Sequence, residues 1–316
     1  MADRDTKVIG EKIMGNLQQY ENYVSYDWWT HIDSRNIEGW LQNFENHDNI
    51  GKLILDSIIF YNEEQIKSYT RNIVNQLKSE VYEREMRLLN GKYHDDDYFD
   101  GKWKKYKEAI RVIPADAEDR AGGSPHLVAR KYRPYLGEEI VVKVDSIQKN
   151  IKEGIKEFIF VDDFSGTGKQ MSDFLSTLIE IDGEIVPIGK ISEYFSDIKV
   201  SVAVYVIHKD ALERLKEEFR TVRIRYVDLL DERLNLLSYD CITYKGKSQD
   251  EIQEIIDYLS EIRTKLIEEQ PDYQKFVEYE LHIPIIFEHG CPNNTFIPLY
   301  AKTKTWKQLF KRGNEI

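Results

Sequence analysis

The sequence predicts an α/β fold with a mostly parallel sheet and a helical N-terminal region. Short apolar segments rich in β-branched residues recur between residues 109 and 230, and several are followed by segments of helical periodicity. Buried strands that alternate with helices build a parallel sheet. We therefore expect a helical N-terminal region over residues 1–100, an α/β core over 101–245, and a C-terminal helix and tail over 246–316 that pack on the core.

The N-terminal region is expected to hold two short helices, at residues 36–44 and 49–61, and one long helix. In residues 63–86, EEQIKSYTRNIVNQLKSEVYEREM, apolar side chains recur every three or four positions and share one helix face. Glycines and acidic residues at 90–102 mark a boundary, and the HDDD run there favours an acidic loop over a metal site. The tryptophans of this region are expected to be core or interface residues: Trp28, Trp29 and Trp40.

The core is expected to contain strands at residues 109–116, 138–144, 158–163, 200–208 and 222–230. Helical patterns follow the third and fourth of these strands, at 169–181 and 209–219, and a further amphipathic helix is expected at 249–269. In the tail, residues 280–310, we expect an apolar strand-like segment, a polar turn and a final amphipathic segment.

The chain has 316 residues and a formal net charge of −12, which argues against broad binding of nucleic acid through phosphate neutralisation. Two local basic stretches, Arg130–Arg133 and Lys302–Arg312, keep an RNA or protein partner open. No apolar run approaches the roughly 20 residues that span a bilayer, so we expect a cytoplasmic protein with no membrane partner. Cys241 and Cys291 are not in a metal-like spacing and are expected to be reduced thiols.

The stretch FIFVDDFSGTGKQMSDFL, residues 158–175, places two acids directly after an apolar run. A strand that ends at Val161 would deliver Asp162 and Asp163 to the carboxyl edge of the sheet, where ligands bind in open α/β folds. Adjacent carboxylates repel each other and would repel a phosphate. They suit a neutral diol or a divalent cation.

A glycine turn follows the two acids. Gly166 and Gly168 would let the chain turn tightly and leave backbone N–H groups open. These amides and the start of the next helix favour an anion, most often a phosphate, and Lys169 would add a positive charge. A ribose phosphate offers hydroxyls for the carboxylates and a 5′-phosphate for the turn.

Three rival motifs do not fit this stretch. In a Walker A loop, Asp163 would occupy the place of the first glycine and Gln170 the place of the magnesium-binding hydroxyl. A haloacid-dehalogenase-like site would need an aspartate where Phe164 stands, and the dinucleotide-binding pattern G-x-G-x-x-G is absent. A plain strand–turn–helix with a polar turn stays open as the alternative.

These residues resemble the signature of the type I phosphoribosyltransferases, which is an apolar strand, two acids and a short Thr-Gly loop that opens a helix. The resemblance covers the α/β core from about Ala109 to Arg233 and implies a sheet of the phosphoribosyltransferase type. It implies that Asp162 and Asp163 act as the catalytic pair, holding the ribose of phosphoribosyl pyrophosphate or a nucleotide, with Mg²⁺ bridging the pyrophosphate. The implied 5′-phosphate loop is Ser165, Gly166, Thr167, Gly168, Lys169 and Gln170.

A pyrophosphate loop should follow the first core strand in such a protein. Gly122, Gly123 and Ser124 lie in the right place, and Arg130 with its basic neighbours could neutralise the pyrophosphate. The same residues also fit an ordinary helix start followed by a solvated basic face, so both interpretations stay open.

More narrowly, the chain resembles phosphoribosyltransferase-like proteins of bacterial defence gene clusters of the retron type. Those proteins have a helical N-terminal region and a late CPNNT segment, here Cys291–Thr295, in which Asn293 and Asn294 could bind a ligand or form a turn. Lys169 and Gln170 depart from the type I pattern, which usually ends its loop with small residues and a Thr or Ser.

Two classes of function follow from the resemblance and the residues. The first is an enzyme of Mg-dependent phosphoribosyl or ribosyl transfer that acts as an antiphage effector. The second is a non-catalytic nucleotide-sensing or partner-binding module. Whether a mobile cationic loop closes over the pocket would discriminate between the two, and residues 131–139 are the segment in which such a loop would be sought. His126 and His289 lie near suggestive loops, but a lone histidine is weak evidence for catalysis.

Overall fold

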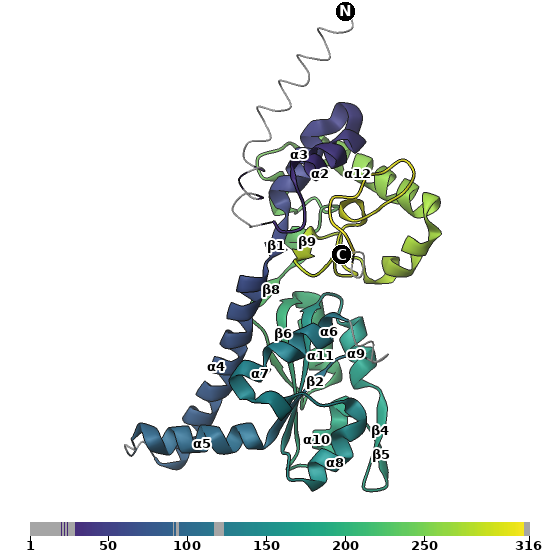
Figure 1. Ribbon diagram of the computed structural model, residues 1–316. Helices are drawn as coiled ribbons and strands as arrows, with labels where there is room; N and C mark the ends of the chain where they lie inside the picture. Colours follow the sequence, from purple (N-terminus) through teal and green to yellow (C-terminus); the bar gives the residue numbers. More distant parts are fainter. Residues whose placement is uncertain are drawn as a thin grey trace, which may run out of the picture. The chain divides into compact units, whose positions relative to one another are not determined.

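The structure is a computed structural model that describes residues 29–90, 95–116 and 123–312, together with residues 20, 22, 24 and 92. It divides into two compact units, coloured along the chain in Figure 1. The sheet unit is Glu64–Asp231, and the terminal unit combines Met1–Glu63 with Glu232–Ile316. The long N-terminal helix thus groups with the sheet, whereas the sequence pattern suggested boundaries near residues 100 and 245.

The sheet unit contains a parallel sheet whose strand order, in the described part of the chain, is β2-β3-β6-β7, with β8 also paired to β6. An antiparallel hairpin, β4–β5, stands beside it. The strands are β2 Ile110–Pro114, β3 Glu157–Ser165, β4 Leu178–Ile181, β5 Glu184–Pro187, β6 Lys199–His208, β7 Arg223–Arg225 and β8 Asp228–Leu230. The α/β class and the mostly parallel sheet predicted from the sequence are confirmed.

Helices lie on both sides of this sheet in Figure 1. Their bounds are α4 Glu63–Leu88, α5 Asp96–Glu108, α6 Ser124–Lys131, α7 Arg133–Leu136, η2 Glu138–Ile140, η3 Val144–Ser146, α8 Ile147–Lys152, α9 Lys169–Leu175, η4 Ile188–Lys190, α10 Ile191–Tyr194 and α11 Lys209–Glu218. The long helix expected at 63–86 is confirmed as α4. The acidic run expected to be a loop instead starts α5, with the Asp95 carboxylate accepting a hydrogen bond from the Tyr98 amide.

Strand β6 shows how the core is built, because its side chains alternate between the two faces of the sheet. Val200, Val202 and Val204 are fully buried in a cluster with α9 and α11. On the opposite face the Tyr205 hydroxyl lies 2.6 Å from the hydroxyl of Thr70 in α4. Both faces are therefore covered, as the continuous apolar runs of the sequence require.

Two expected elements of the core were wrong. Residues 138–144 form η2, a loop and the start of η3, and they pair with the sheet through a bridge between Val112 and Val141. The helix expected at 169–181 ends at Leu175, and the remainder becomes β4. A turn at Asp182 and Gly183, both at positive φ, then reverses the chain into β5.

The terminal unit is mainly helical and has its own core. Its elements are α2 Ser34–Leu41, η1 Gln42–His47, α3 Asp48–Ser57, β1 Ile59–Tyr61, η5 Glu232–Leu234, η6 Ile242–Tyr244, α12 Gln249–Glu269, η7 Pro271–Tyr279, β9 Ile285–Phe287 and η8 Ile297–Leu299. Helix α12 matches its expected range, and the end of the second short helix is instead β1, which pairs in parallel with β9.

Aromatic residues from both ends of the chain fill the core of the terminal unit. The indoles of Trp40 and Trp306 donate to the same carbonyl, Pro298 O, at 2.9 and 3.0 Å. Trp29 is buried in this core as well, which confirms the expectation for two of the three N-terminal tryptophans, whereas Trp28 lies outside the described residues. Both cysteines are free and buried. None of the described helices is both long and apolar enough to cross a membrane.

Candidate functional site

Strand β3 carries both aspartates at its carboxyl end, where the sequence placed them. The strand does not end at Val161 as expected, because its parallel ladder with β6 continues to the pair Ser165↔Ile207. Asp162 and Asp163 therefore belong to the strand and inherit its fixed backbone. Ser165, assigned to the phosphate loop from the resemblance, is the last residue of β3 and is buried.

The two carboxylates are buried side by side, with only 5% of Asp162 and 6% of Asp163 exposed. Each Oδ1 accepts a backbone amide: the amide of Asp163 lies 2.9 Å from Asp162 Oδ1, and that of Phe164 lies 2.8 Å from Asp163 Oδ1. The Ser124 hydroxyl at the start of α6 lies within 3.4 Å of Asp162 and 3.2 Å of Asp163. These contacts fix the orientation of both side chains.

This environment acts strongly on the protonation of Asp162. Burial raises the pKa of this carboxyl well above its ordinary value, and the neighbouring charge of Asp163 raises it further. The backbone amide of Asp163 and the Ser124 hydroxyl act in the opposite direction but do not compensate. A hydroxyl-bearing ligand or a cation beside the pair would relieve this electrostatic cost.

The glycine turn follows at once and links β3 to α9. Gly166 is buried and Thr167 half-buried, and the Thr167 hydroxyl accepts from the Lys169 amide at 3.4 Å. Gly168 has a left-handed backbone at φ 74°, and a Cβ there would lie 2.9 Å from the Ala211 Cα. Both the backbone angle and the close approach of α11 therefore require glycine at this position.

The last two residues of the expected phosphate loop are not placed as a simple cradle requires. Lys169 was expected to add a positive charge to the turn, but its ammonium lies 2.8 Å from the carboxylate of Asp173, one helical turn further along α9. Gln170 is exposed on the same helix. In the structure the ammonium of Lys169 is therefore paired within α9.

The residues expected to form a pyrophosphate loop are only partly brought to the site. Gly122 lies outside the described residues, and Gly123 is the N-cap of α6, directly before Ser124. Arg130 lies in the last turn of α6 and is exposed. At a rise of about 1.5 Å per residue, it is roughly 9 Å along the helix from Ser124, so it does not share one short loop with the glycines.

Asp116 and His126 form a second polar pair at the carboxyl edge of the sheet, and the sequence did not predict this pair. Asp116 follows β2, and its Oδ2 lies 3.8 Å from Nε2 of His126 in the first turns of α6. The signal that could have found Asp116 is its place directly after a buried strand, the same signal that identified Asp162. His126 was noted in the sequence without a partner.

Residues 131–139, the segment considered for a closing cationic loop, form the end of α6 followed by α7 and the start of η2. Tyr132 and Leu136 are buried there. The CPNNT segment also serves local structure. The side-chain amide of Asn294 donates to the backbone carbonyl of Tyr279, and the Arg312 guanidinium donates to the side-chain oxygen of Asn293. These contacts favour the turn interpretation.

The described residues contain no cluster of three or more His, Cys, Asp or Glu side chains that could hold a metal ion by itself. The buried pair of Asp162 and Asp163 still fits a magnesium complex, because Mg²⁺ is usually held by one or two carboxylates together with substrate phosphates and water. A dedicated protein cage is not needed for that mode of binding.

Comparison with protein families agrees with this geometry. The model of the family described as PRTase-CE matches residues 37–312. The chain belongs to the PRTase-CE family. The match extends over the described elements of both units, so the terminal unit is part of the PRTase-CE module as well as the sheet. It supports a phosphoribosyltransferase-like protein, in line with the two acids and glycine turn of β3. A comparison with curated proteins gave no match.

Proposed function

We propose that the carboxyl edge of the sheet binds the ribose 5-phosphate group of phosphoribosyl pyrophosphate or a nucleotide, and that the protein catalyses transfer of the phosphoribosyl group. The observation that carries this proposal is the buried pair Asp162 and Asp163 directly before the glycine turn. A carboxylate pair and an amide-rich turn on one strand match the two ends of a ribose phosphate.

Each part of the site has a role in this proposal. Asp162 and Asp163 accept hydrogen bonds from the two free ribose hydroxyls, which replaces their mutual repulsion by charge-assisted hydrogen bonds. The backbone amides of residues 166–168 hold the 5′-phosphate. Ser124 keeps the two carboxylates in position through its hydroxyl.

The chemistry is a substitution at C1 of the ribose. The bond between C1 and the pyrophosphate oxygen breaks, the leaving group takes the electron pair, and a new bond forms between C1 and a nitrogen or oxygen of the acceptor. The acceptor then loses a proton to water or to the leaving group. Because the two carboxylates and the turn fix both ends of the sugar, the protein lowers the barrier mainly by positioning.

Mg²⁺ bound with the pyrophosphate would neutralise charge on the leaving group. The buried carboxylates lie at the ribose end, so their contribution is to orient the sugar and to add negative charge near C1 as it becomes oxocarbenium-like.

A non-catalytic nucleotide sensor is the alternative, and one observation favours it. In the structure the ammonium of Lys169, the lysine of the turn, is paired with Asp173. A site that recognises the ligand by amides and carboxylates alone can bind a ribose phosphate without stabilising a leaving group. The two functions share the same binding step and differ in turnover.

The first test is calorimetric titration with phosphoribosyl pyrophosphate and MgCl₂. We expect saturable binding by the wild type and at least about a tenfold loss in the Asp162→Asn/Asp163→Asn variant, because each charged hydrogen bond contributes about 1.5–3 kcal/mol. The matched control is Asp145→Asn/Asp182→Asn, which makes the same chemical change at two exposed positions of the sheet unit. Wild-type protein that is folded but binds neither this ligand nor a nucleotide would refute the proposal.

Turnover separates the enzyme from the sensor. Release of pyrophosphate from the bound substrate in the presence of a panel of nucleobases, nucleosides and amines would establish transfer. Binding without release in every case would favour the sensor.

We further propose that this activity serves antiphage defence, a role supported only by the layout shared with retron-type proteins. Its test is the plating efficiency of phages on bacteria that carry the complete gene cluster. The cluster with Asp162→Asn/Asp163→Asn should lose protection, whereas equal protection by both forms would separate defence from the ribose-phosphate site.

A further inference from the structure

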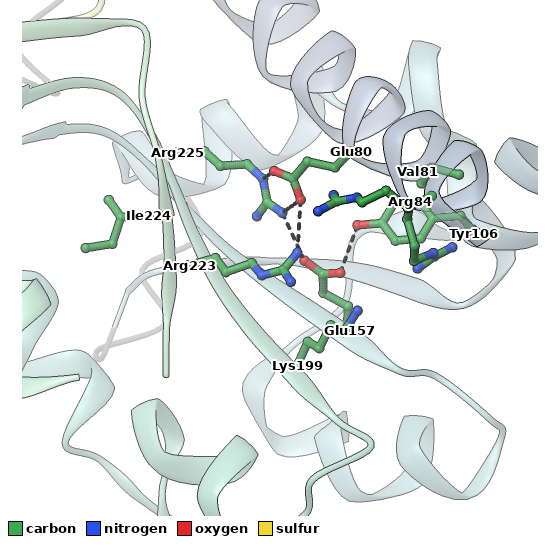
Figure 2. Close-up of a pocket in the computed structure, with 10 residues that line it drawn as sticks. Glu80, Val81, Arg84, Tyr106, Glu157, Lys199, Arg223, Ile224 and Arg225 are labelled. Atoms are coloured by element: carbon green, nitrogen blue, oxygen red, sulfur yellow. Dashed lines mark hydrogen bonds and ion pairs between the residues drawn. The ribbon is translucent and has the colours of Figure 1, made fainter. Parts of the chain in front are cut away.

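A cavity lies at the amino edge of the sheet, the edge opposite to Asp162 and Asp163. Glu157, Lys199 and Arg223 are the first residues of β3, β6 and β7, and parallel strands begin at a common edge. Helices α4 and α5 close the cavity from the side (Figure 2). Its lining residues are Glu80, Val81, Arg84, Arg87, Tyr106, Glu157, Lys199, Arg223, Ile224 and Arg225.

The size of this cavity suits a small ligand. Its volume is about 600 Å³, within the range of about 300–1,000 Å³ that is typical of sites for nucleotides and other small molecules. All of its lining residues belong to the sheet unit.

The lining is strongly basic in an acidic protein. The described lining residues include five cationic side chains and two carboxylates, whereas the whole chain carries a net charge of −12. Clefts lined by one sign of charge concentrate ligands of the opposite sign. The cavity therefore favours an anion.

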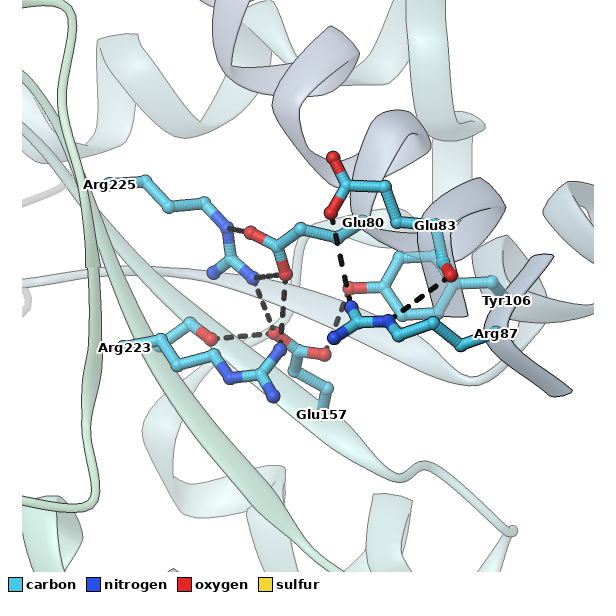
Figure 3. A network of polar contacts seen from close by, with 8 residues as sticks. Glu80, Glu83, Arg87, Tyr106, Glu157, Arg223 and Arg225 are labelled. Carbon is cyan, nitrogen blue, oxygen red and sulfur yellow. Dashed lines mark hydrogen bonds and ion pairs between the residues drawn. The ribbon is translucent and has the colours of Figure 1, made fainter. Parts of the chain in front are cut away.

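The two carboxylates are already engaged by the protein, as Figure 3 shows. Glu80 receives a two-pronged contact from Arg225, with Nε 3.0 Å from Oε1 and Nη2 2.8 Å from Oε2, and Arg223 lies 3.1 Å from the same carboxylate. Burial alone would raise the pKa of Glu80, but the two arginines outweigh it and lower the pKa. Glu157 accepts from Ser201 and Tyr106 at 2.6 and 2.8 Å.

One strong donor in the cavity wall is left unused by this network. The side chain of Arg225 is 3% exposed, and its Nη1 is buried without a hydrogen-bond partner among the described residues. An unsatisfied donor on a buried charged group is costly to the folded protein. Because Nη1 is shielded from solvent, Arg225 acts on the cavity through its positive charge and not through a direct contact.

Two further arginines stand at the entrance and are weakly held. Arg84 is 46% exposed and 3.4 Å from Glu85, and Arg87 is 78% exposed and 3.9 Å from Glu83. The pair of Arg87 with Glu83 is exposed on both sides and contributes little to stability, and the buried Glu85 keeps Lys102 at 2.8 Å if Arg84 turns away, so both guanidinium groups can turn toward a ligand. They come from successive turns of α4, and both line the cavity.

We propose that this cavity is a second ligand site, which binds a small phosphorylated molecule of nucleotide size. Guanidinium groups present paired N–H donors that match phosphate oxygens, so Arg84 and Arg87 would hold the phosphates, and the buried Arg225 would add positive charge behind them. The site is separate from the ribose-phosphate site and lies at the other end of the same strand, β3. The proposal does not depend on the activity proposed above.

The test uses the full chain with Asp162→Asn/Asp163→Asn, so that binding at the carboxyl edge is removed. Calorimetric titrations with ATP, GTP and inorganic tripolyphosphate distinguish a nucleotide from a plain polyphosphate. We expect saturable binding of at least one of these probes, with affinity that falls as salt rises. Adding Arg84→Gln/Arg87→Gln to this background should weaken that binding at least about tenfold.

The matched control replaces two cations elsewhere in the sheet unit, Arg214→Gln/Arg220→Gln, and should leave the affinity unchanged. Failure of all three probes to bind would overturn the proposal, as would equal affinity in the Arg84/Arg87 variant and its control. Binding of a single-stranded oligonucleotide but of none of the small probes would also overturn it, in favour of a nucleic-acid surface.

Discussion

The hydroxyl of Ser124 lies 3.2 Å from a carboxylate oxygen of Asp163. This contact joins the first residue of α6 to the carboxyl end of β3 and reaches Asp162 as well, at 3.4 Å. A single hydroxyl thus holds two buried like charges in one arrangement. The paired acids are an electrostatic cost that the fold retains, which is typical of a functional site.

The first prediction is that Asp162→Asn stabilises the protein near neutral pH. Because burial and the charge of Asp163 raise the pKa of Asp162, the folded protein holds a proton that the unfolded chain has lost between the two pKa values. The free energy of unfolding therefore falls as pH rises through this window. Thermal unfolding should show a higher Tm for the variant than for the wild type, by roughly 2–4 °C for each kcal/mol gained in the free energy of unfolding. The difference in Tm should be smaller in mildly acidic solution. A lower Tm at every pH would contradict this.

The second prediction concerns Ser124→Ala. The pKa of Asp162 is raised mainly by burial, and the Ser124 hydroxyl partly offsets this. Its loss should raise the pKa further, so that binding of phosphoribosyl pyrophosphate reaches half its maximum at a higher pH. Ser124→Thr keeps a hydroxyl and should keep the wild-type profile. Identical pH profiles for the alanine variant and the wild type would show that Ser124 does not act on the pair.

The third prediction is that Gly168→Ala destabilises the sheet unit by about 2–4 kcal/mol, from left-handed strain of about 1–2 kcal/mol and overpacking against Ala211. The control is Gly154→Ala, which has a similar positive φ of 94° but no neighbour within 4 Å of the added Cβ. This control variant should be destabilised by the backbone strain alone. Urea unfolding of both variants measures the difference, and equal losses would mean that the contact with α11 is unimportant.

The fourth prediction is that Glu157→Gln destabilises the protein by about 2–4 kcal/mol, because it leaves the buried charge of Arg225 less well compensated. Glu153→Gln, at an exposed pair with Lys149, should change stability by less than about 1 kcal/mol. Chemical unfolding followed by circular dichroism checks both values. A loss for Glu157→Gln no larger than for its control would show that the charge of Glu157 contributes little.

The fifth prediction is that Asp173→Asn strengthens binding of the ribose phosphate a few-fold. The change releases Lys169 from its ion pair, which lies 2.8 Å away and is largely exposed, so stability should shift by less than about 0.5 kcal/mol. Without the attraction of Asp173, the ammonium can turn toward the 5′-phosphate. Calorimetry of the variant beside Lys169→Met/Asp173→Asn checks this, because the gain should vanish when the lysine is absent.

The aspartates and the glycine turn could be predicted from the sequence because their signals are local. An apolar run marks β3, and paired acids followed by Gly166 and Gly168 mark its exit. The end of the strand was placed too early because Asp162 and Ser165 are polar. Pairing with the longer strand β6 keeps them in the sheet, and this pairing is a tertiary contact that the local sequence does not reveal.

The basic cavity could not be predicted in the same way, because its residues come from five separate elements of the chain, α4, α5, β3, β6 and β7. Glu80 is in α4, Glu157 begins β3 and Arg225 belongs to β7. In the sequence each looks like a charge on a solvated face. Only the packing of α4 against the start of the strands brings them together and buries Arg225.

The terminal unit is built from both ends of the chain, and this affects how the protein can fold during synthesis. Trp40 donates its indole N–H to Pro298, a partner 258 residues away along the chain, and β1 pairs with β9. The sheet unit is complete once Asp231 has left the ribosome, whereas the terminal unit must wait for its second segment. Its first segment, with buried Phe44 and Trp40, stays exposed during this interval. Nascent chains stalled before residue 285 should therefore carry a folded sheet and a segment that attracts chaperones.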